Sequence, residues 1–202
     1  MQRVVNTTSM SDFEPTCLTN QFLIAMPNLE DPNFFHTVSY ICNHDDSGAM
    51  GVTINRPLDV GLGDLLEHLK IPTDDPDIAS IPVFAGGPVQ ADRGFVLHRT
   101  QKTNDNEWEA SMEVSDIISL TMSQDIIEAI ALNEGPEDFL IMLGYAGWSE
   151  GQLEHELLSN AWLSGVANDK VIFETPTENQ WTHAAKHLGI ELGLMSTDVG
   201  HS

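Results

Sequence analysis

The stretch that decides the fold is residues 139–160, which read FLIMLGYAGWSEGQLEHELLSN. The apolar run 139–143 predicts a buried strand, because short apolar runs bounded by turn residues are typical of one. Gly144, Gly147 and Gly151 then alternate with two aromatic residues, and the residues beyond them have helical character. Glycine can take positive φ or let another backbone come close. We therefore interpret this stretch as a strand-to-helix switch that borders a site.

The length of the chain predicts one domain. Its 202 residues suffice for one well-buried core and are too few for two. We place this domain at residues 19–202 and expect residues 1–18 to form a disordered tail, in which Met1 and Met10 are alternative start residues. No apolar run approaches the roughly 20 residues of a membrane helix, and the N-terminus lacks a secretory pattern. These features predict a cytoplasmic protein that does not associate with membranes.

The charge of the chain argues against one class of function. Only 8 Lys and Arg stand against 31 Asp and Glu, which gives a formal net charge of -23 at pH 7. A nucleic-acid binder gains affinity by neutralising phosphates with clustered cations. We therefore expect no direct binding to nucleic acid. An acidic surface also favours basic partners over anionic membranes.

The local patterns predict more strands than helices. Segments rich in β-branched and aromatic residues predict strands at 22–26, 38–43, 50–54, 83–85, 94–98, 107–112, 117–122, 139–143 and 171–173. Helical spacing of apolar residues predicts helices at 62–69 and 124–131, the second with Ser123 as its N-cap. Capping-box patterns predict two more helices, which begin with Ser149 and Thr177.

The connections between strands indicate the fold class. Residues 43–48 contain the turn formers of a hairpin, and several neighbouring strands are joined too closely for βαβ crossovers. We predict an α+β fold with a mixed, largely antiparallel β-sheet flanked by helices.

One motif suggests an enzyme. Gly147-Trp148-Ser149-Glu150-Gly151 matches the G-x-S-x-G nucleophile elbow, which lies between a strand and a helix. A serine hydrolase also needs an acid and a histidine downstream, and the chain offers Asp169, Asp198, His183, His187 and His201. The sequence before the elbow lacks alternating βα units and an oxyanion segment. A serine esterase is thus the alternative function, with Ser149 as a helix cap the simpler interpretation.

Three patterns fall short of a metal site. Residues 155–159 begin like a zinc-protease helix but have a serine in place of the second histidine. His183 and His187 lie four residues apart without a third donor in register. Residues 43–54 begin like a calcium loop but end in isoleucine instead of glutamate. We therefore predict no metal and no cofactor.

Two arginines near glycine-rich turns are candidates for binding an anion. Gly86 and Gly87 form a backbone corner before a proline, and Arg93 and His98 flank the strand that follows. In a chain so poor in cations, Arg56 and Arg93 are the strongest candidates for an anion contact. The structural alternative is a turn in which Arg93 pairs with one of the many acids.

Several motifs, taken in order, resemble the bacterial AlgH-like (YqgE) family. The resemblance extends from about Thr19 to His201 and departs from the family in the tail and in the very acidic loops. The motifs that carry it are FLIAMP (22–27), DPNF (31–34), GAMGVTINRP (48–57), GGPV (86–89), GFVLH (94–98), GYAGW (144–148), GQLE (151–154), NAWL (160–163), VIF (171–173) and TP (175–176).

This resemblance implies a fold and a type of function. It implies a cytosolic single-domain protein whose sheet is bent into a partly barrel-like arrangement with helices outside. The family has no established enzymatic activity, its pattern does not require a serine at position 149, and one branch is linked by name to regulation of alginate synthesis. We therefore interpret the chain as a non-catalytic protein that binds an unidentified small molecule or protein in bacterial regulation.

Eight residues are our candidates for that binding site. We expect them to converge around one pocket or groove, while a wholly structural role remains the alternative. They are Gly86, Gly87, Arg93, His98, Tyr145, Trp148, Gln152 and Glu154.

Overall fold

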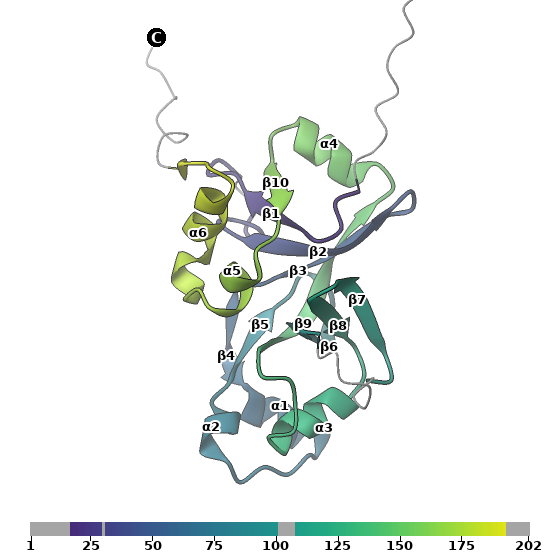
Figure 1. Ribbon diagram of the computed structural model, residues 1–202, viewed down its shortest axis with the longest axis vertical. Coiled ribbons are helices and arrows are strands. Elements are labelled where there is room, and N and C mark those ends of the chain that lie inside the picture. The colour runs from purple at the N-terminus through teal and green to yellow at the C-terminus, as the bar shows by residue number, and fades with distance from the viewer. Residues whose placement is uncertain (1–16, 30, 101–107, 193–202) are drawn as a thin grey trace, which may run out of the picture.

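A computed structural model describes residues 17–29, 31–100 and 108–192 of the chain. It is elongated, with one group of strands and helices above another in Figure 1. The strands are β1 (Gln21–Ala25), β2 (Val38–Asp45), β3 (Gly48–Thr53), β4 (Pro57–Gly61), β5 (Pro82–Ala85), β6 (Val89–Arg99), β7 (Ser111–Ser115), β8 (Ile118–Thr121), β9 (Phe139–Ser149) and β10 (Trp162–Val166). The helices are α1 (Leu62–Leu69), α2 (Pro76–Ala79), α3 (Asp125–Ala131), α4 (Gln152–Leu158), α5 (Asp169–Phe173) and α6 (Gln180–His187), the last preceded by a 3-10 turn at Thr177–Asn179.

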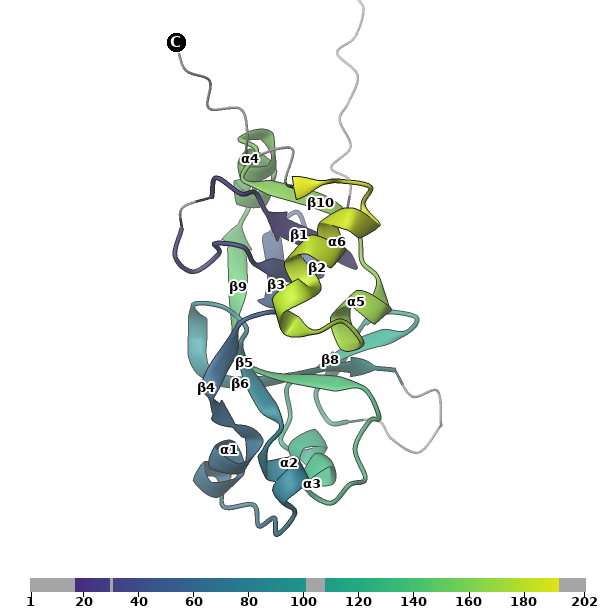
Figure 2. The same cartoon turned by 90° about the vertical axis from the view of Figure 1, so that its left-hand side faces the viewer.

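The sheet is mixed and mostly antiparallel. Eight strands follow each other in the order β10-β1-β2-β3-β9-β6-β8-β7, and every pair along this path is antiparallel. Strand β5 pairs in parallel with β9 and carries β4 on its other side. The sheet curves into a half-barrel with helices outside it, which confirms the predicted α+β class (Figures 1 and 2).

Helices cover both faces of the upper strands. Phe22 and Ile24 on β1 share a buried cluster with residues of α5 and α6, whereas Leu23 and Ala25 belong to a cluster that includes Leu153 of α4. Successive side chains of a strand point to opposite faces. All four are fully buried because both faces are covered.

Helices α1, α2 and α3 gather at the other end of the molecule (Figure 1). Leu62 and Leu66, four residues apart on α1, pack in one buried cluster with Ile78 of α2, Ile126 of α3 and Ile141 of β9. This spacing places both leucines on one face of α1, as the apolar periodicity predicted.

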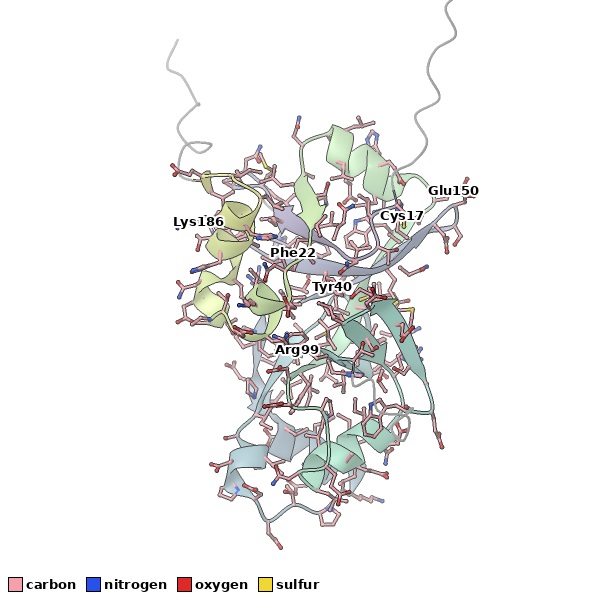
Figure 3. All side chains as sticks on the ribbon, viewed as in Figure 1. Cys17, Phe22, Tyr40, Arg99, Glu150 and Lys186 are labelled. Atoms are coloured by element: carbon pink, nitrogen blue, oxygen red, sulfur yellow. The ribbon has the colours of Figure 1, made fainter. Side chains whose placement is uncertain are left out.

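Arg99 links the two regions (Figure 3). Its Nε lies 2.8 Å from Asp138 Oδ2, just before β9, and its Nη1 and Nη2 reach Asp169 of α5 and Glu174. The guanidinium also lies 5.4 Å from the centre of the Phe173 ring. One planar guanidinium that contacts several carboxylates holds these segments in place better than isolated surface ion pairs do.

Some elements differ from the prediction. The predicted strand 171–173 is wrong, because Asn168 caps a helix there by accepting a hydrogen bond from the Lys170 N–H, and Val171 and Ile172 are buried in the cluster that includes α6. Here packing and a cap outweigh the β-propensity of the segment. Strands β4 and β10 and the short helix α2 were not predicted, and β7 lies later in the chain than predicted.

The helix starts were also partly wrong. Gln124, not Ser123, is the N-cap of α3, and the Ser123 hydroxyl instead donates to Asp125 Oδ1. Thr177 makes no side-chain cap and begins a 3-10 turn before α6. The hairpin at residues 43–48 is confirmed, since Asp45 pairs with Gly48.

Leu18 was predicted to belong to the disordered tail, but it is part of the core. Leu18 is buried, and its N–H donates to Nδ1 of His44 at 3.0 Å. Residues 1–16 lie outside the described residues, as do Asp198 and His201. Within the part of the chain that the structure describes, no helix has the length and apolar character needed to cross a membrane.

Strand β9 continues through the glycine-rich segment to Ser149, so the predicted end of this strand at residue 143 is wrong, whereas the predicted change from strand to helix within residues 139–160 is confirmed. Gly144 has φ +73° and is buried, and Val89 O and Ala91 Cα lie 3.1 Å from where a Cβ would be. The carbonyl of Gly87 would be closer still. Gly144 therefore serves a crossing of backbones inside the sheet. Helix α4 starts only at Gln152.

We expect Gly144→Ala to lower the free energy of unfolding by about 3 kcal/mol or more, because the new methyl group meets backbone that cannot move away. Gly151→Ala is the matched control: Gly151 has φ +70° but nothing within 4 Å of a Cβ. This control should cost about 1 kcal/mol, which is the strain of a left-handed alanine. Urea denaturation measures both. Equal losses would show that backbone crowding at Gly144 is unimportant.

Candidate functional site

Gly86 and Gly87 hold the corner where β5 meets β9. The Gly86 N–H donates to Leu143 O at 2.8 Å, and the Gly86 carbonyl accepts from the Thr53 N–H at 2.8 Å. A Cβ on either glycine would overlap the backbone of Gly144 or Tyr145. Both residues thus allow a backbone-to-backbone contact, and neither offers a side chain to a ligand.

A bulge in β6 carries Arg93 outward. Val89 pairs with Tyr145 of β9 and Gly94 pairs with Leu143, so the residues between them form a long bulge opposite Gly144. Gln90 within this bulge has φ +49°. Bulges bend a strand and redirect its side chains. Arg93 consequently projects from the sheet beside the C-terminal half of β9.

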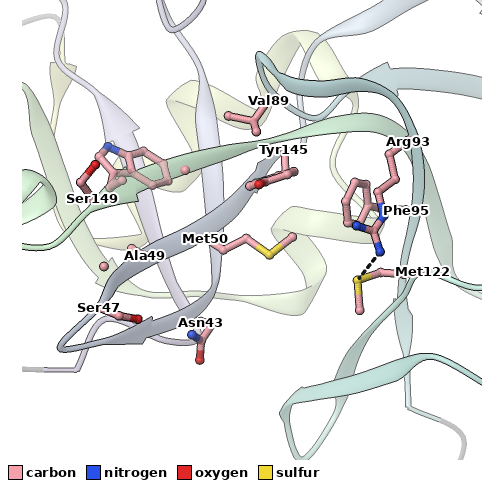
Figure 4. Close-up of a pocket in the computed structure, with 13 residues that line it drawn as sticks. Asn43, Ser47, Ala49, Met50, Val89, Arg93, Phe95, Met122, Tyr145 and Ser149 are labelled. Atoms are coloured by element: carbon pink, nitrogen blue, oxygen red, sulfur yellow. Dashed lines mark hydrogen bonds between the residues drawn. The ribbon is translucent and has the colours of Figure 1, made fainter.

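Arg93 reaches a pocket of about 500 Å³, which we call the Arg93 pocket (Figure 4). Figure 4 shows Arg93, Phe95 and Met122 at one end, Ser47 and Ser149 at the other, and Met50 and Tyr145 between them. The other lining residues are Asn43, Gly48, Ala49, Val89, Gly147 and Trp148. The hairpin β2–β3, the bulge of β6 and the end of β9 therefore form the walls.

The contacts of Arg93 involve no acid among the described residues. Its Nη1 donates to Gln90 Oε1 at 3.2 Å, and its Nη2 lies 3.9 Å from Met122 Sδ. The guanidinium carbon lies 5.6 Å from the centre of the Phe95 ring. None of the ion pairs of the described structure includes Arg93, and no Asp or Glu lines this pocket. The predicted pairing of Arg93 with an acid is thus wrong for the described part of the chain.

A second pocket of about 470 Å³ lies beside Gly147 and Trp148. We call it the Glu156 pocket. Glu156 Oε2 accepts from the indole N–H groups of Trp148 at 2.9 Å and Trp162 at 2.8 Å, while Oε1 accepts from Gln152 Nε2 at 2.9 Å. Gln152 Oε1 in turn accepts from the Ser149 N–H at 3.0 Å. One carboxylate thereby positions two tryptophans and the start of α4.

The remaining two candidates, Glu154 and His98, lie outside both pockets. His44 is buried, and its Nδ1 accepts from the Leu18 N–H, so its Nε2–H donates to Glu154 Oε1 at 2.8 Å. Glu154 therefore ties α4 to β2. His98 is buried in β6, where Nδ1–H donates to the Arg99 carbonyl at 3.0 Å and Nε2 lies 2.9 Å from Thr121 Oγ1.

The eight candidates are thus divided by the fold. Arg93, Tyr145 and Trp148 line the Arg93 pocket, and Trp148 and Gln152 line the Glu156 pocket. Gly86 and Gly87 build the corner beside them, and His98 and Glu154 have partners elsewhere. The Arg56 guanidinium, the other anion candidate, donates instead to the carbonyls of Pro32 and Phe35.

Sequence reasoning missed several residues of these pockets. Glu156 could have been found, since it lies four residues after Gln152 on a predicted helix and so shares its face. Phe34 and Trp162 stand in motifs of the family resemblance, but their proximity comes from the fold. Met50 and Met122 carry no sequence signal that would separate them from core methionines.

Ser149 does not have the surroundings of a catalytic nucleophile. It is the last residue of β9 and pairs with Gly48. No hydrogen bond of the described structure joins its Oγ to a histidine, and Asp169, one of the predicted acids, pairs with Arg99. Ser149 is not the N-cap of α4 either, because Gly151 holds that position. Among the described residues there is also no cluster of three His, Cys, Asp or Glu side chains arranged to hold a metal.

Comparison with known proteins identifies the family. A family model described as AlgH-like matches residues 22–193. The chain belongs to the AlgH-like family. Two similar proteins are UPF0301 proteins: that of Thioalkalivibrio sulfidiphilus is 54% identical over 184 residues (91% of this chain and 96% of the relative), and that of Nitrosococcus oceani is 48% identical over 183 residues (91% and 96%). The resemblance of the sequence motifs is therefore confirmed.

Solved structures show the same fold. The solution structure of the AlgH protein from Pseudomonas aeruginosa matches this AlgH-like chain with a TM-score of 0.75 and 44% identity, covering 96% of this chain and 100% of that one. A crystal structure of a Corynebacterium diphtheriae protein matches with a TM-score of 0.70 at 18% identity, covering 89% and 92% of the two chains, and supports the fold alone.

The burial of His98 predicts a pH dependence of stability. Desolvation lowers the pKa of His98 below its ordinary value of 6.5. The unfolded chain therefore takes up a proton at His98 before the folded chain does, so this residue's contribution to stability is present above about pH 6.5 and is lost as the pH falls toward the lower folded pKa.

When the pH is lowered from about 7.5 to about 5.5, we expect the free energy of unfolding to fall less in His98→Gln than in the wild type. The reason is that the variant has no side chain that takes up a proton at this position. Urea midpoints at the two pH values measure the difference. An unchanged pH dependence in His98→Gln would contradict the expectation.

Proposed function

We propose that this AlgH-like protein is a non-catalytic binding protein whose Arg93 pocket takes a small molecule with an anionic group and an apolar body. The observation that carries the proposal is Arg93 itself. In a chain of charge -23, its guanidinium faces a pocket without a carboxylate and has neutral contacts only, among the described residues. A guanidinium with free donors binds carboxylate or phosphate oxygens in a bidentate manner.

The rest of the pocket supports a ligand with an apolar part. Met50 and Tyr145 lie between Arg93 and the polar side chains of the hairpin, and Phe95 and Met122 lie beside Arg93. A pocket of about 500 Å³ is within the range of small-molecule sites, and an apolar wall with a few polar groups is their usual composition. Methionine also adapts its shape to different ligands.

The acidity of the protein does not prevent an anion from binding here. Exposed charges more than about 10 Å apart are largely screened at 0.1 M salt. The nearest charge therefore dominates the electrostatic potential that a ligand meets in the pocket. Among the lining residues that charge is the guanidinium of Arg93. Ligand binding without catalysis agrees with a regulatory role in the cytosol, in which the bound ligand alters how the protein binds a partner. The charge of the chain argues against nucleic acid as a direct partner.

We expect Arg93→Gln to weaken the binding of octanoate about tenfold or more, because a hydrogen bond to a charged group contributes about 1.5–3 kcal/mol. Isothermal titration calorimetry measures the affinity. Lys186→Gln, which removes the same charge from the exposed face of α6, is the matched control and should bind as the wild type does. Equal affinity of Arg93→Gln and wild type, or no octanoate binding by the wild type, would contradict the proposal.

The same proposal predicts that a fluorophosphonate probe leaves the folded protein unlabelled, because no histidine is placed to activate Ser149 among the described residues. Intact-mass spectrometry after incubation with the probe checks this. Labelling that disappears in Ser149→Ala would establish the esterase alternative and overturn the non-catalytic assignment.

A further inference from the structure

The side chain of Met122 contacts the guanidinium that the proposed function assigns to anion binding. Its Sδ lies 3.9 Å from Arg93 Nη2, a contact that Figure 4 shows as a dashed line. Met122 directly follows β8, and its N–H donates to the carbonyl of Ala110 at 2.8 Å, which fixes the backbone at this point. The sulfur is therefore held against one of the nitrogens that would bind a ligand anion.

A thioether sulfur is only a weak hydrogen-bond acceptor. In the reduced protein, Arg93 Nη2 therefore keeps its capacity to donate to a carboxylate, which is a much stronger acceptor. Oxidation of methionine to the sulfoxide adds an oxygen to the sulfur and makes the side chain polar. Because the sulfur already touches Nη2, rotation of the Met122 side chain alone brings this oxygen to hydrogen-bond distance of the guanidinium.

Met122 is also accessible to a small oxidant. It is partly exposed and lines the Arg93 pocket of about 500 Å³, as Met50 does. Met142, in contrast, is fully buried in the core. Since an oxidant must reach the sulfur before it can react, peroxide in the pocket oxidises Met122 and Met50 before Met142.

The sulfoxide oxygen competes with a ligand for the donors of Arg93. The Nη1 of Arg93 already donates to Gln90 Oε1 at 3.2 Å. Once the sulfoxide of Met122 accepts from Nη2, both outer nitrogens of the guanidinium have an internal partner. A ligand anion then meets fewer free N–H groups, together with the partial negative charge of the sulfoxide oxygen beside them.

We propose that Met122 is a site of reversible oxidation that weakens anion binding in the Arg93 pocket. This inference rests on the proposed function of that pocket. The sulfur attacks one oxygen of hydrogen peroxide: the S–O bond forms as the O–O bond breaks, and the other oxygen leaves with both hydrogens as water. The sulfur loses two electrons and the peroxide gains them. A methionine sulfoxide reductase reverses the step with two thiols, which become a disulfide while the oxygen leaves as water.

Mild treatment of the full chain with hydrogen peroxide tests this proposal. Peptide mass spectrometry measures the oxidised fraction at each methionine, and isothermal titration calorimetry measures the affinity for octanoate. We expect the affinity to fall about tenfold as Met122 becomes oxidised, which is the factor expected for the loss of a hydrogen bond to a charged group. Treatment with methionine sulfoxide reductases should restore the affinity of the untreated protein.

Two leucine variants identify the methionine responsible. Met122→Leu removes the sulfur and keeps an apolar side chain of similar size, so the ratio of its octanoate affinities before and after peroxide should stay near one. Met112→Leu is the matched control, because Met112 is a partly exposed methionine of the neighbouring strand β7 and is not among the lining residues of the Arg93 pocket. This variant should bind octanoate as the wild type does, and peroxide should weaken its binding to the same extent.

The Nε–H NMR signal of Arg93, identified by its absence in Arg93→Gln, gives a readout that does not depend on octanoate. Oxidation should move this signal in the wild type and in Met112→Leu, and should leave it in place in Met122→Leu. Three results would overturn this proposal alone: an unmoved Arg93 signal after oxidation of Met122, an unchanged octanoate affinity, or an equal loss of affinity in Met122→Leu. An untreated wild type that does not bind octanoate would instead overturn the proposed function, and this proposal with it.

Discussion

The close contact of backbones between Gly86–Gly87 and Gly144–Tyr145 is the constraint on which the rest of the structure depends. Before Gly144, strand β9 pairs with β5 and β6, and after Tyr145 it pairs with β3. The left-handed conformation of Gly144 and the absence of side chains at the contact let β9 change partners without ending. The lower and upper groups of strands are therefore parts of one sheet.

Both pockets follow from this crossing. The bulge of β6 opposite Gly144 directs Arg93 toward one side of β9, and the continuation of β9 brings the indole N–H of Trp148 to Glu156 of α4. Gly147 and Trp148 line both pockets. Two pockets thus lie next to each other, and among the described residues one is lined by a guanidinium and no acid, the other by two carboxylates and no cation.

The scarcity of cations makes the use of each arginine informative. Arg99 links β6 to Asp138, Asp169 and Glu174, and Arg56 holds the carbonyls of the loop before β2. These two arginines have structural partners, which explains their positions without a ligand. Arg93 has only neutral contacts within the described structure. Arg93 is therefore the arginine on which the proposed anion site rests.

The sequence by itself determined the fold class, the main helices and the hairpin at residues 43–48, because apolar periodicity and turn residues act over a few neighbours. It also singled out Arg93, Trp148 and the glycines of β9. It did not reveal that the glycines lie within a strand, since nothing local shows that Gly87 approaches Gly144 across more than fifty residues of chain. It likewise could not show which acids lie near which cations. Tertiary structure decided that β9 continues to Ser149, that residues 171–173 are helical, and that Arg93 and Glu156 belong to different pockets, because each of these depends on contacts between segments distant in sequence.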